Sequence, residues 1–405
     1  MAREWRASTW GEEISLEYGK ALRDYDKTHG KFRVFGSNGP IGWTEQSLAP
    51  GPGVILGRKG AYRGIQFCHE PFFVIDTAYY VVPKTELDMR WLYYAITYHK
   101  LGEIDEGSPI PSTTRSAVYV RDLDVPPSTE QKAIAAVLGA LDDKIELSRR
   151  MNATLEAMAR ALFQSWFVDF DPVRAKLDGV PPAGLDPATA ALFPEHFEEG
   201  EYGKLPVGWR HIAIDEVCAM NAWTLGKDDD LETLEYIEIS EVSRGNIANI
   251  DTYTRGEEPS RARRRLRHGD TVLSTVRPDR GSYFLALNPP KNRVASTGFA
   301  VLTPTKAPWS FVHAAMTQPE VSDHLGQMAD GGAYPAVRPE IIGNMKVAVP
   351  NEPKILEAFH RTCAPLFEQA EANRTQSRTL ATLRDTLLPK LLSGELRAAP
   401  ASPSA

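Results

Sequence analysis

Two long stretches of the chain place apolar residues at the spacing of an α-helix. The first stripe consists of Ile134, Leu138, Leu141, Ile145, Met151, Leu155, Met158 and Leu162. The second consists of Leu356, Phe359, Cys363, Leu366, Ala370, Leu380, Leu383, Leu387 and Leu391. Steps of mostly three and four residues predict helices with one narrow apolar face. We expect these helices over residues 128–170 and 352–394, and each would span roughly 60 Å at about 1.5 Å per residue.

Polar and small residues mark the ends of both predicted helices. The sequence STEQ, which begins at Ser128, has the form of a capping box. Asn351 is a candidate N-cap and Gly394 a candidate C′ glycine. Two narrow stripes of this length predict an antiparallel coiled coil, because the two halves of the chain repeat head to tail. Asn152 and Gln376 lie near the stripes, where they either fix the register or face solvent.

The rest of the chain repeats itself over about half its length. The segment VILGRKGAYRGIQF (54–67) aligns with TVLSTVRPDRGSYF (271–284) at an offset of 217. Later segments align in the same order: 77–83 with 297–303 and 91–97 with 311–317 at 220, and 107–115 with 331–339 at 224. Offsets that increase and never cross indicate a duplicated module. Strand-like runs and short helices in each copy predict an α/β (α+β) fold.

These patterns divide the chain into six predicted segments. They are a globular domain over 1–127, the first helix over 128–170, a linker over 171–205, a second globular domain over 206–351, the second helix over 352–394 and a flexible tail over 395–405. The prolines and small residues of DPVRAKLDGVPPAGLDPATAALFPEHF favour a linker with at most one short helical turn.

The first predicted helix ends in an aromatic segment, LFQSWFVDFDPV, at residues 162–173. Its apolar face is wider than one antiparallel helix covers, so a third body must bury it, either the second globular region or a partner. Burial of part of the face under residues 380–391 is an equally good interpretation. We expect a partner protein to bind here. The candidate partner-binding residues are Leu162, Phe163, Trp166, Phe167, Leu387 and Leu391.

Composition excludes several classes of protein. Of 405 residues, 42% are hydrophobic and 24% charged, as in a soluble globular protein. No apolar run is long enough to cross a bilayer, and the N-terminus has no secretory pattern. Cys68, Cys218 and Cys363 lie far apart, which favours buried thiols in a reduced cytosol over a zinc site.

The charge distribution gives a mixed signal. A formal net charge of −7 argues against a wholly basic nucleic-acid binder. Six arginines nevertheless lie between Arg255 and Arg267. This run either binds phosphate or forms an exposed face balanced by Glu257 and Glu258.

Sequence motifs of catalysis are absent. There is no GxxxxGK[ST], HExxH or GxSxG, and GSNGPIG has the wrong spacing for a dinucleotide-binding loop. The NPP at 288–290 is followed by Lys291 rather than by an aromatic residue, and we interpret it as a turn. Glu130 and Lys132 begin a helix and point in different directions, so they do not form a nuclease metal site with Asp124. We therefore expect no catalytic and no metal-binding residue.

Hydrogen-bonding side chains instead gather in glycine-rich loops at matching positions of the two halves. Glycine lets the backbone approach a phosphate closely, and arginine can bind guanine with two hydrogen bonds. For any one of these loops, a solvated surface is the competing interpretation. The candidate DNA-binding residues are Ser37, Asn38, Arg58, Lys59, Tyr62, Arg63, Ser112, Thr113, Thr114 and Arg115 in the first half, and Arg244, Thr275, Arg277, Arg280, Tyr334 and Arg338 in the second.

Several motifs together resemble the specificity subunits of type I restriction–modification systems. They are FGSNGPIG (35–42), VPPSTEQKAI (125–134), ALFQSWFVDFDPVRAK (161–176), GKLPVGW (203–209), STVRPDRGS (274–282), STGFAVL (296–302) and LLPKLLSGEL (387–396). The resemblance covers essentially the full length in the family's own order.

The resemblance implies a function without catalysis in this chain. Each globular region would be a target recognition domain that reads one half of a split DNA sequence, and the helices would set the spacer. Two methyltransferase subunits would dock and bring S-adenosylmethionine, and two restriction subunits that use ATP and Mg would join them in the cytoplasm. The alternative from another class is a coiled-coil scaffold with two ligand-binding modules. Neither interpretation gives the recognised bases.

Overall fold

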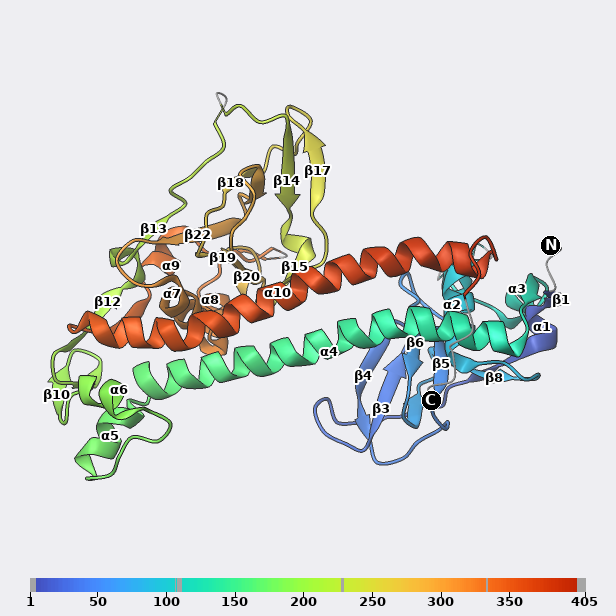
Figure 1. Cartoon of the computed structure of the whole chain (residues 1–405), viewed down its shortest axis with the longest axis horizontal. Helices are drawn as coiled ribbons and strands as arrows, with labels where there is room; N and C mark the ends of the chain where they lie inside the picture. The colour runs from blue at the N-terminus through green and yellow to red at the C-terminus, as the bar shows by residue number, and fades with distance from the viewer. Residues whose placement is uncertain (1–4, 106, 108–110, 227–228, 333, 399–405) are drawn as a thin grey trace. The chain divides into compact units, whose positions relative to one another are not determined.

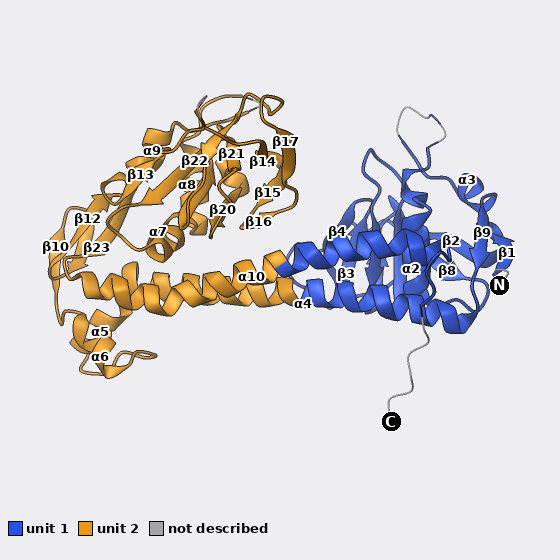
Figure 2. Cartoon of the chain, turned by 45° about the horizontal axis from the view of Figure 1, so that its top comes forward, with its two compact units in different colours: residues 1–147, 376–405 blue, residues 148–375 orange. Residues whose placement is uncertain are grey.

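The computed structural model describes residues 5–105, 107, 111–226, 229–332 and 334–398. The chain forms two compact units, one of residues 1–147 with 376–405 and the other of residues 148–375 (Figure 2). Two helices of 40 residues, α4 (Ser128–Phe167) and α10 (Pro353–Leu392), each contribute part of their length to each unit (Figure 1). Unit 1 and unit 2 are described separately below.

Unit 1 contains a four-stranded antiparallel sheet and a smaller three-stranded sheet. The order in the first is β2 (Ile14–Tyr18), β8 (Ala78–Pro83), β5 (Gly53–Gly57) and β6 (Ile65–Cys68). The second is β4 (Gly39–Thr44), β3 (Phe32–Gly36) and β7 (Phe72–Val74), with β3 and β7 parallel. A separate pair joins β1 (Arg6–Thr9) to β9 (Asp122–Val125). The helical elements are α1 (Trp10–Glu13), α2 (Met89–Tyr98), the 3-10 turn η1 (Leu101–Glu103) and α3 (Arg115–Tyr119).

Unit 2 has the corresponding sheets. The first is β13 (Cys218–Met220), β22 (Phe299–Pro304), β19 (Asp270–Ser274) and β20 (Tyr283–Ala286). The second is β17 (Asp251–Thr254), β14 (Thr233–Ile237), β21 (Arg293–Ser296) and β18 (Ala262–Arg265), with β14 and β21 parallel. A pair joins β12 (Trp209–Ala213) to β23 (Lys346–Pro350), and β15 (Val242–Ser243) forms a hairpin with β16 (Asn246–Ile247). The helical elements are the 3-10 turns η2 (Ile214–Glu216), η3 (Ile239–Glu241) and η4 (Pro278–Arg280) and the helices α7 (Trp309–Met316), α8 (Pro319–Gln327) and α9 (Pro339–Gly343).

The two units therefore repeat one topology, which confirms the predicted α+β fold class and internal repeat. Each has an antiparallel four-stranded sheet in the same chain order and a second sheet built on a parallel pair. The terminal pairs also match in register, since Thr9 lies opposite Asp122 in unit 1 and Ala213 lies opposite Lys346 in unit 2. Strand β18, which carries part of the arginine run, has no counterpart in the second sheet of unit 1 as described.

A short helix packs on the four-stranded sheet of each unit and adds apolar side chains to the core. In unit 1, α2 begins where the Asp88 carboxylate accepts hydrogen bonds from the backbone N–H groups of Arg90 and Trp91. The helix buries Trp91 and Leu92 in the core below the sheet. In unit 2, α7 buries Phe311 in the same way.

Within each unit, α4 and α10 pack antiparallel and are linked by polar pairs as well as apolar residues. In unit 1, Arg384 forms an ion pair with Asp142 at 2.8 Å. In unit 2, buried Asn152 donates to the carbonyl of Ala370 at 3.0 Å and accepts from the amide of Asn373 at 2.8 Å. Asn152 thus lies inside the helix pair, as one of the two sequence interpretations held.

Gln376 is exposed, as one of the two interpretations held, and the partner of Asn152 is Asn373. Two details of α4 differ from the sequence prediction. The first helix ends at Phe167, three residues before the predicted end at 170. Gln131 does not form the predicted capping box; its side chain donates to the Pro126 carbonyl and accepts from the Asp88 N–H, each at 2.9 Å.

Of the two capping predictions for α10, one is wrong and one is confirmed. Asn351 does not cap the helix, because the carboxylate of Glu352 accepts from the Lys354 N–H. Gly394 does have the left-handed conformation of a C′ glycine, with φ of 71°. The predicted flexible tail at 395–405 lies partly outside the described residues.

The segment predicted as a linker, 171–205, is folded. It contains α5 (Asp171–Leu177), α6 (Pro187–Leu192) and the hairpin of β10 (Phe197–Gly200) with β11 (Gly203–Pro206). Val173, Phe193 and Leu205 are buried in the core of unit 2. The expectation of at most one helical turn was wrong, because these apolar side chains bind the segment to the unit.

The aromatic end of α4 is buried in the core of unit 2. Phe163, Trp166 and Phe167 are 5%, 3% and 3% exposed. The ring of Phe167 packs against Phe359 of α10, with centroids 5.1 Å apart, and against Phe311 of α7, at 5.0 Å.

Unit 2 itself is therefore the third body that the wide apolar face required. Phe163, Trp166 and Phe167 therefore serve mainly as core residues of unit 2, and Phe163 and Phe167 reach the surface only where they line a groove. The prediction of burial under residues 380–391 is wrong, because the residue of α10 that packs on Trp166 and Phe167 is Phe359. Of the other candidates, Leu391 is in the core of unit 1, and Leu162 and Leu387 are partly buried.

Candidate nucleic-acid interface

Three loops meet at one end of the four-stranded sheet in unit 1. The loop after β5 and the loop before α3 form a bridge between Lys59 and Ser112. The N–H of Thr113 donates to the Arg58 carbonyl at 2.9 Å. Ser37, from the turn between β3 and β4, donates its hydroxyl to the Lys59 carbonyl. These bonds hold residues that lie far apart in the sequence in one cluster.

Two arginines of this cluster stack on the ring of Tyr18, the last residue of β2. The guanidinium carbons of Arg58 and Arg115 lie 4.8 and 4.1 Å from the ring centroid. Arg58 also donates to the Asp76 carbonyl at 3.1 Å, and Arg115 lies 3.5 Å from the Glu17 carboxylate. Tyr18 remains 46% exposed, so the stack faces solvent at its edge.

Tyr18 was absent from the sequence candidates. It ends a strand forty residues before Arg58, and no local motif marks it. Only the fold brings it to Arg58 and Arg115.

Several candidates in unit 1 are structural rather than available for DNA. Arg63 donates to the carbonyls of Gly102, Gly60 and Ile104 at 2.7, 2.8 and 3.2 Å. Thr113 is buried, and the hydroxyl of Thr114 accepts from the Ala117 N–H at the start of α3. Ser37 and Ser112 are partly buried in the loop contacts described above.

The exposed candidates are Asn38, Lys59 and Tyr62, and Tyr62 is 78% exposed. Together with the stacked Arg58 and Arg115 they form what we call the unit 1 loop cluster. It combines positive charge, an amide and exposed aromatic rings, the groups that proteins use to contact phosphates and bases.

Unit 2 joins the equivalent loops by the same kind of bridge. Val276 pairs with Ala336. Val276 lies 217 residues after Lys59 and Ala336 lies 224 residues after Ser112, which are the offsets found in the sequence. The N–H of Arg277 donates to the Pro335 carbonyl at 2.8 Å. The repeat therefore extends from topology to the contact that assembles the loops.

Exposed arginines and a tyrosine form the unit 2 loop cluster. Arg277, in a left-handed conformation with φ of 47°, places its guanidinium 4.7 Å from the ring centroid of Tyr334. Tyr334 is 74% exposed, and Arg280 and Arg338 are exposed as well. Arg244 is exposed too, and its N–H donates to the carbonyl of Gly281, the residue that follows Arg280.

Thr275 does not belong to the accessible set. It is 8% exposed, and its hydroxyl donates to the Gly298 carbonyl at 2.8 Å. Arg63 and Arg280, which align in the sequence, therefore differ in kind, because Arg63 supports its loop and Arg280 faces solvent.

The arginine run of unit 2 is largely neutralised within the unit. Arg255 and Arg263 both pair with Glu258, and Arg265 pairs with Asp229 at 2.6 Å. Burial lowers the pKa of Arg264. The interpretation of a charge-balanced face thus fits better than that of a phosphate site. The carboxylates that pair with the arginines are those of Glu258 and Asp229, rather than Glu257 and Glu258.

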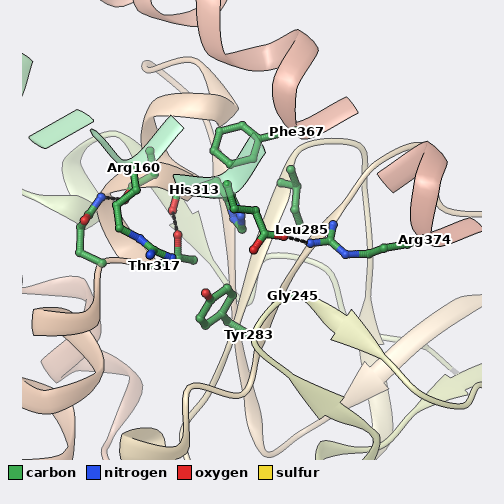
Figure 3. Close-up of a pocket in the computed structure, with 11 residues that line it drawn as sticks. Arg160, Gly245, Tyr283, Leu285, His313, Thr317, Phe367 and Arg374 are labelled. Carbon is green, nitrogen blue, oxygen red and sulfur yellow. Dashed lines mark hydrogen bonds and ion pairs between the residues drawn. The ribbon is translucent and has the colours of Figure 1, made fainter. Parts of the chain in front are cut away.

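A small, partly open cavity lies between the helix pair and the sheet of unit 2. Arg374, Tyr283, His313 and Phe367 surround it (Figure 3), with an ion pair between Arg374 and Glu156. Its volume of about 20 Å³ is enough for one water molecule. Burial lowers the pKa of His313 to about 3, so this histidine is neutral near pH 7. The cavity is too small for a substrate.

Chemically reactive groups are sparse in the described residues. None of them form a cluster of three or more His, Cys, Asp or Glu side chains suited to a metal ion. Burial raises the pKa of both the Cys218 and Cys363 thiols to about 12, which makes them poor nucleophiles. No helix in the described ranges is long and apolar enough to span a membrane.

Comparisons with known proteins agree with this picture. The profile of the type I restriction modification DNA specificity domain matches residues 22–157. The specificity subunit of the type I restriction enzyme HindI from Haemophilus influenzae is 24% identical over 349 residues, which cover 74% of each chain. That of MjaIX from Methanocaldococcus jannaschii is 21% identical over 404 residues, covering 96% of this chain and 88% of the relative. The type I S subunit from M. genitalium has a similar fold, with 16% identity, a TM-score of 0.60 and 96% coverage of both chains.

The repeated fold, the profile match over residues 22–157 and the similarity to curated subunits along most of the chain support one class of protein. That class is the specificity subunit of type I restriction–modification systems.

Proposed function

We propose that each unit reads one half of a bipartite DNA target through its loop cluster. Unit 1 would use Asn38, Lys59, Tyr62 and the stacked Arg58 and Arg115, and unit 2 would use Arg277, Arg280, Tyr334, Arg338 and Arg244. Arginine and amide groups can bind base edges in the major groove, and the remaining cations and hydroxyls can bind phosphate.

The observation that carries this proposal is the repeated bridge. Lys59 with Ser112 and Val276 with Ala336 assemble loops at the same place in both units, and both clusters expose arginine and tyrosine. A module whose only role is structural has no reason to expose such groups at the same place twice.

In the complete assembly, the helices α4 and α10 would set the spacer between half-sites. Proteins that bind two half-sites contact the major groove about one turn apart, ~34 Å, and each helix is longer than that, at roughly 60 Å. Two methyltransferase subunits would dock on this chain and methylate adenine with S-adenosylmethionine. Two restriction subunits with ATP and Mg would complete a cytoplasmic nuclease complex. This chain would supply specificity and no catalytic group.

The overall negative charge fits a DNA channel that this chain forms together with the methyltransferase subunits. The formal charge of −7 is too acidic for this chain to hold duplex DNA by itself through phosphate contacts. We therefore expect tight binding only when the methyltransferase subunits add positive charge around the duplex. A scaffold without DNA specificity, the competing function, would gain no sequence preference from such partners.

The test is a sequence-selection experiment on the assembled complex. Alanine at Arg280 and Arg338 should reduce preference in one half-site by about 1–3 kcal/mol for each lost base contact, and leave the other half unchanged. Arg361, an exposed arginine of α10, provides the matched control and should leave both halves unchanged. The proposal fails if alanine at Arg280, Arg338, Lys59 and Tyr62 alters neither affinity nor sequence preference.

A further inference from the structure

A groove of about 610 Å³ opens in unit 2 beside the last turn of α4. Phe167, Phe170, Met316 and Leu205 contribute an apolar floor. Val168, the residue after α4, also lines the groove, and 47% of its surface is exposed. Apolar surface in a concave site is favourably covered by a ligand or a partner.

The rim of the groove is positive. Arg174, Lys204 and Lys346 line it with exposed side chains, against one carboxylate, that of Glu320. His211 also lines it, and burial lowers the pKa of this imidazole, so it adds no charge near pH 7. The groove therefore combines an apolar floor with a cationic edge.

Unit 1 has a groove at the equivalent place, beside the last turn of α10, with a volume of about 510 Å³. Leu392 and Ser393 end α10 there as Phe167 and Val168 end α4. Its rim is acidic, with Asp122 and Asp124.

The strand registers show that one charged position of the two rims corresponds. Asp122 faces Thr9 in the pair of β1 with β9, and Lys346 faces Ala213 in the pair of β12 with β23. One structural position thus carries opposite charges in the two units. The unit 1 groove is therefore a natural control for any interaction of the unit 2 groove that depends on charge.

We propose that the unit 2 groove binds a protein segment that carries an apolar side chain flanked by carboxylates. Resting on the proposed function, this segment belongs to the methyltransferase subunit. The floor receives the apolar side chain, and Arg174, Lys204 and Lys346 bind the carboxylates through charge-assisted hydrogen bonds. The acidic rim of the unit 1 groove repels the same segment. A phosphate backbone fits the unit 2 groove poorly, because it has no apolar group to cover Val168.

Site-specific photo-crosslinking of the assembled complex tests the proposal. A photoreactive amino acid replaces Val168 in one variant and Ser393 in another, and each is combined with the cognate methyltransferase subunit, with and without duplex DNA. Position 168 should crosslink to a methyltransferase peptide rich in Asp and Glu, and position 393 should not crosslink to that peptide.

Charge reversal separates this interaction from simple proximity. Lys204→Glu with Lys346→Glu should lower the yield from position 168 about tenfold or more, because like charges then face each other. Asp122→Lys, the matched change in unit 1, should leave that yield unchanged. All three residues are exposed, so unfolding curves equal to wild type are expected to show intact folding.

The proposal is overturned if the complex forms and binds DNA specifically while position 168 gives no methyltransferase adduct. It is also overturned if charge reversal does not change the yield, or if position 168 crosslinks to DNA instead. Those results leave the proposed function intact. Failure of the wild-type chain to assemble with the methyltransferase subunit would overturn both.

Discussion

Replacing Phe167 by alanine should destabilise unit 2 rather than weaken partner binding directly. Phe167 is 3% exposed, and its ring centroid lies 5.0–5.6 Å from those of Phe163, Trp209, Phe311 and Phe359. These rings come from α4, β12, α7 and α10, so the side chain joins the helix pair to the globular part of the unit.

The magnitude follows from burial and from the cavity left behind. Truncation of a buried phenylalanine typically costs about 3–5 kcal/mol. Each aromatic pair adds about 0.5–1.5 kcal/mol beyond area burial, so the upper half of that range is expected here. A total stability of about 5–15 kcal/mol means that the change removes a large share of it.

Equilibrium denaturation measured by tryptophan fluorescence checks this value, because Trp166 and Trp209 lie beside Phe167. Val168→Ala is the matched control, since Val168 is 47% exposed and its loss should change stability by less than about 0.5 kcal/mol. A Phe167→Ala variant within about 1 kcal/mol of wild type that no longer binds methyltransferase would refute the assignment of Phe167 to the core.

Three further predictions follow from buried polar groups. Burial raises the pKa of Asp270 to about 6, above its usual value of 3.8, so the folded chain holds a proton between these pH values that the unfolded chain has lost. The free energy of unfolding of unit 2 should therefore fall by up to about 3 kcal/mol as pH rises through about 6. Asp270→Asn should remove that loss, and identical pH profiles of wild type and variant in denaturant titrations would contradict it. Asn152→Ala leaves the Asn373 amide without its bond and should cost about 1–3 kcal/mol, whereas leucine at both positions should cost less; a double-mutant cycle that shows no coupling would argue against the buried amide pair. Arg63→Ala removes three hydrogen bonds to carbonyls and should lower the unfolding temperature of unit 1, whereas Arg280→Ala should not; equal thermal shifts would show that Arg63 does not support its loop.

Long-range periodicity made the architecture predictable from the sequence. The stripes of α4 and α10 extend over 40 residues each, so small local irregularities do not hide them. The increasing offsets of the repeat predicted two copies of one module, because insertions between strands shift the numbering without changing the topology, and both copies have the same sheet order.

The short elements after α4 were missed although a local signal exists. Asp186 and Pro187 begin α6 as N-cap and first helical residue, and the carboxylate accepts from the N–H groups of Ala188 and Thr189. Asp171 and Pro172 are the first two residues of α5, although its N-cap, Phe170, makes no side-chain capping hydrogen bond. Proline density suggested a linker, whereas Asp-Pro followed by helix-forming residues is typical of a short helix.

The candidate site was predictable only as a set of loops. The sequence identified arginines in glycine-rich loops, but not which guanidinium groups are consumed by carbonyls, as that of Arg63 is. That distinction depends on Gly102 and Ile104, about forty residues away, and so on the fold. The stack on Tyr18 could not be predicted for the same reason, because only the fold brings the end of β2 next to Arg58 and Arg115.

The most direct test of the account is the methylation pattern of a host that carries this chain with its methyltransferase subunit. The account predicts methylated adenines in a sequence of two short half-sites separated by a fixed spacer. Changes at Arg280 and Arg338 should alter one half-site, and changes at Lys59 and Tyr62 the other. A single undivided motif, or changes in both half-sites from the residues of one unit, would contradict the claim that each unit reads its own half.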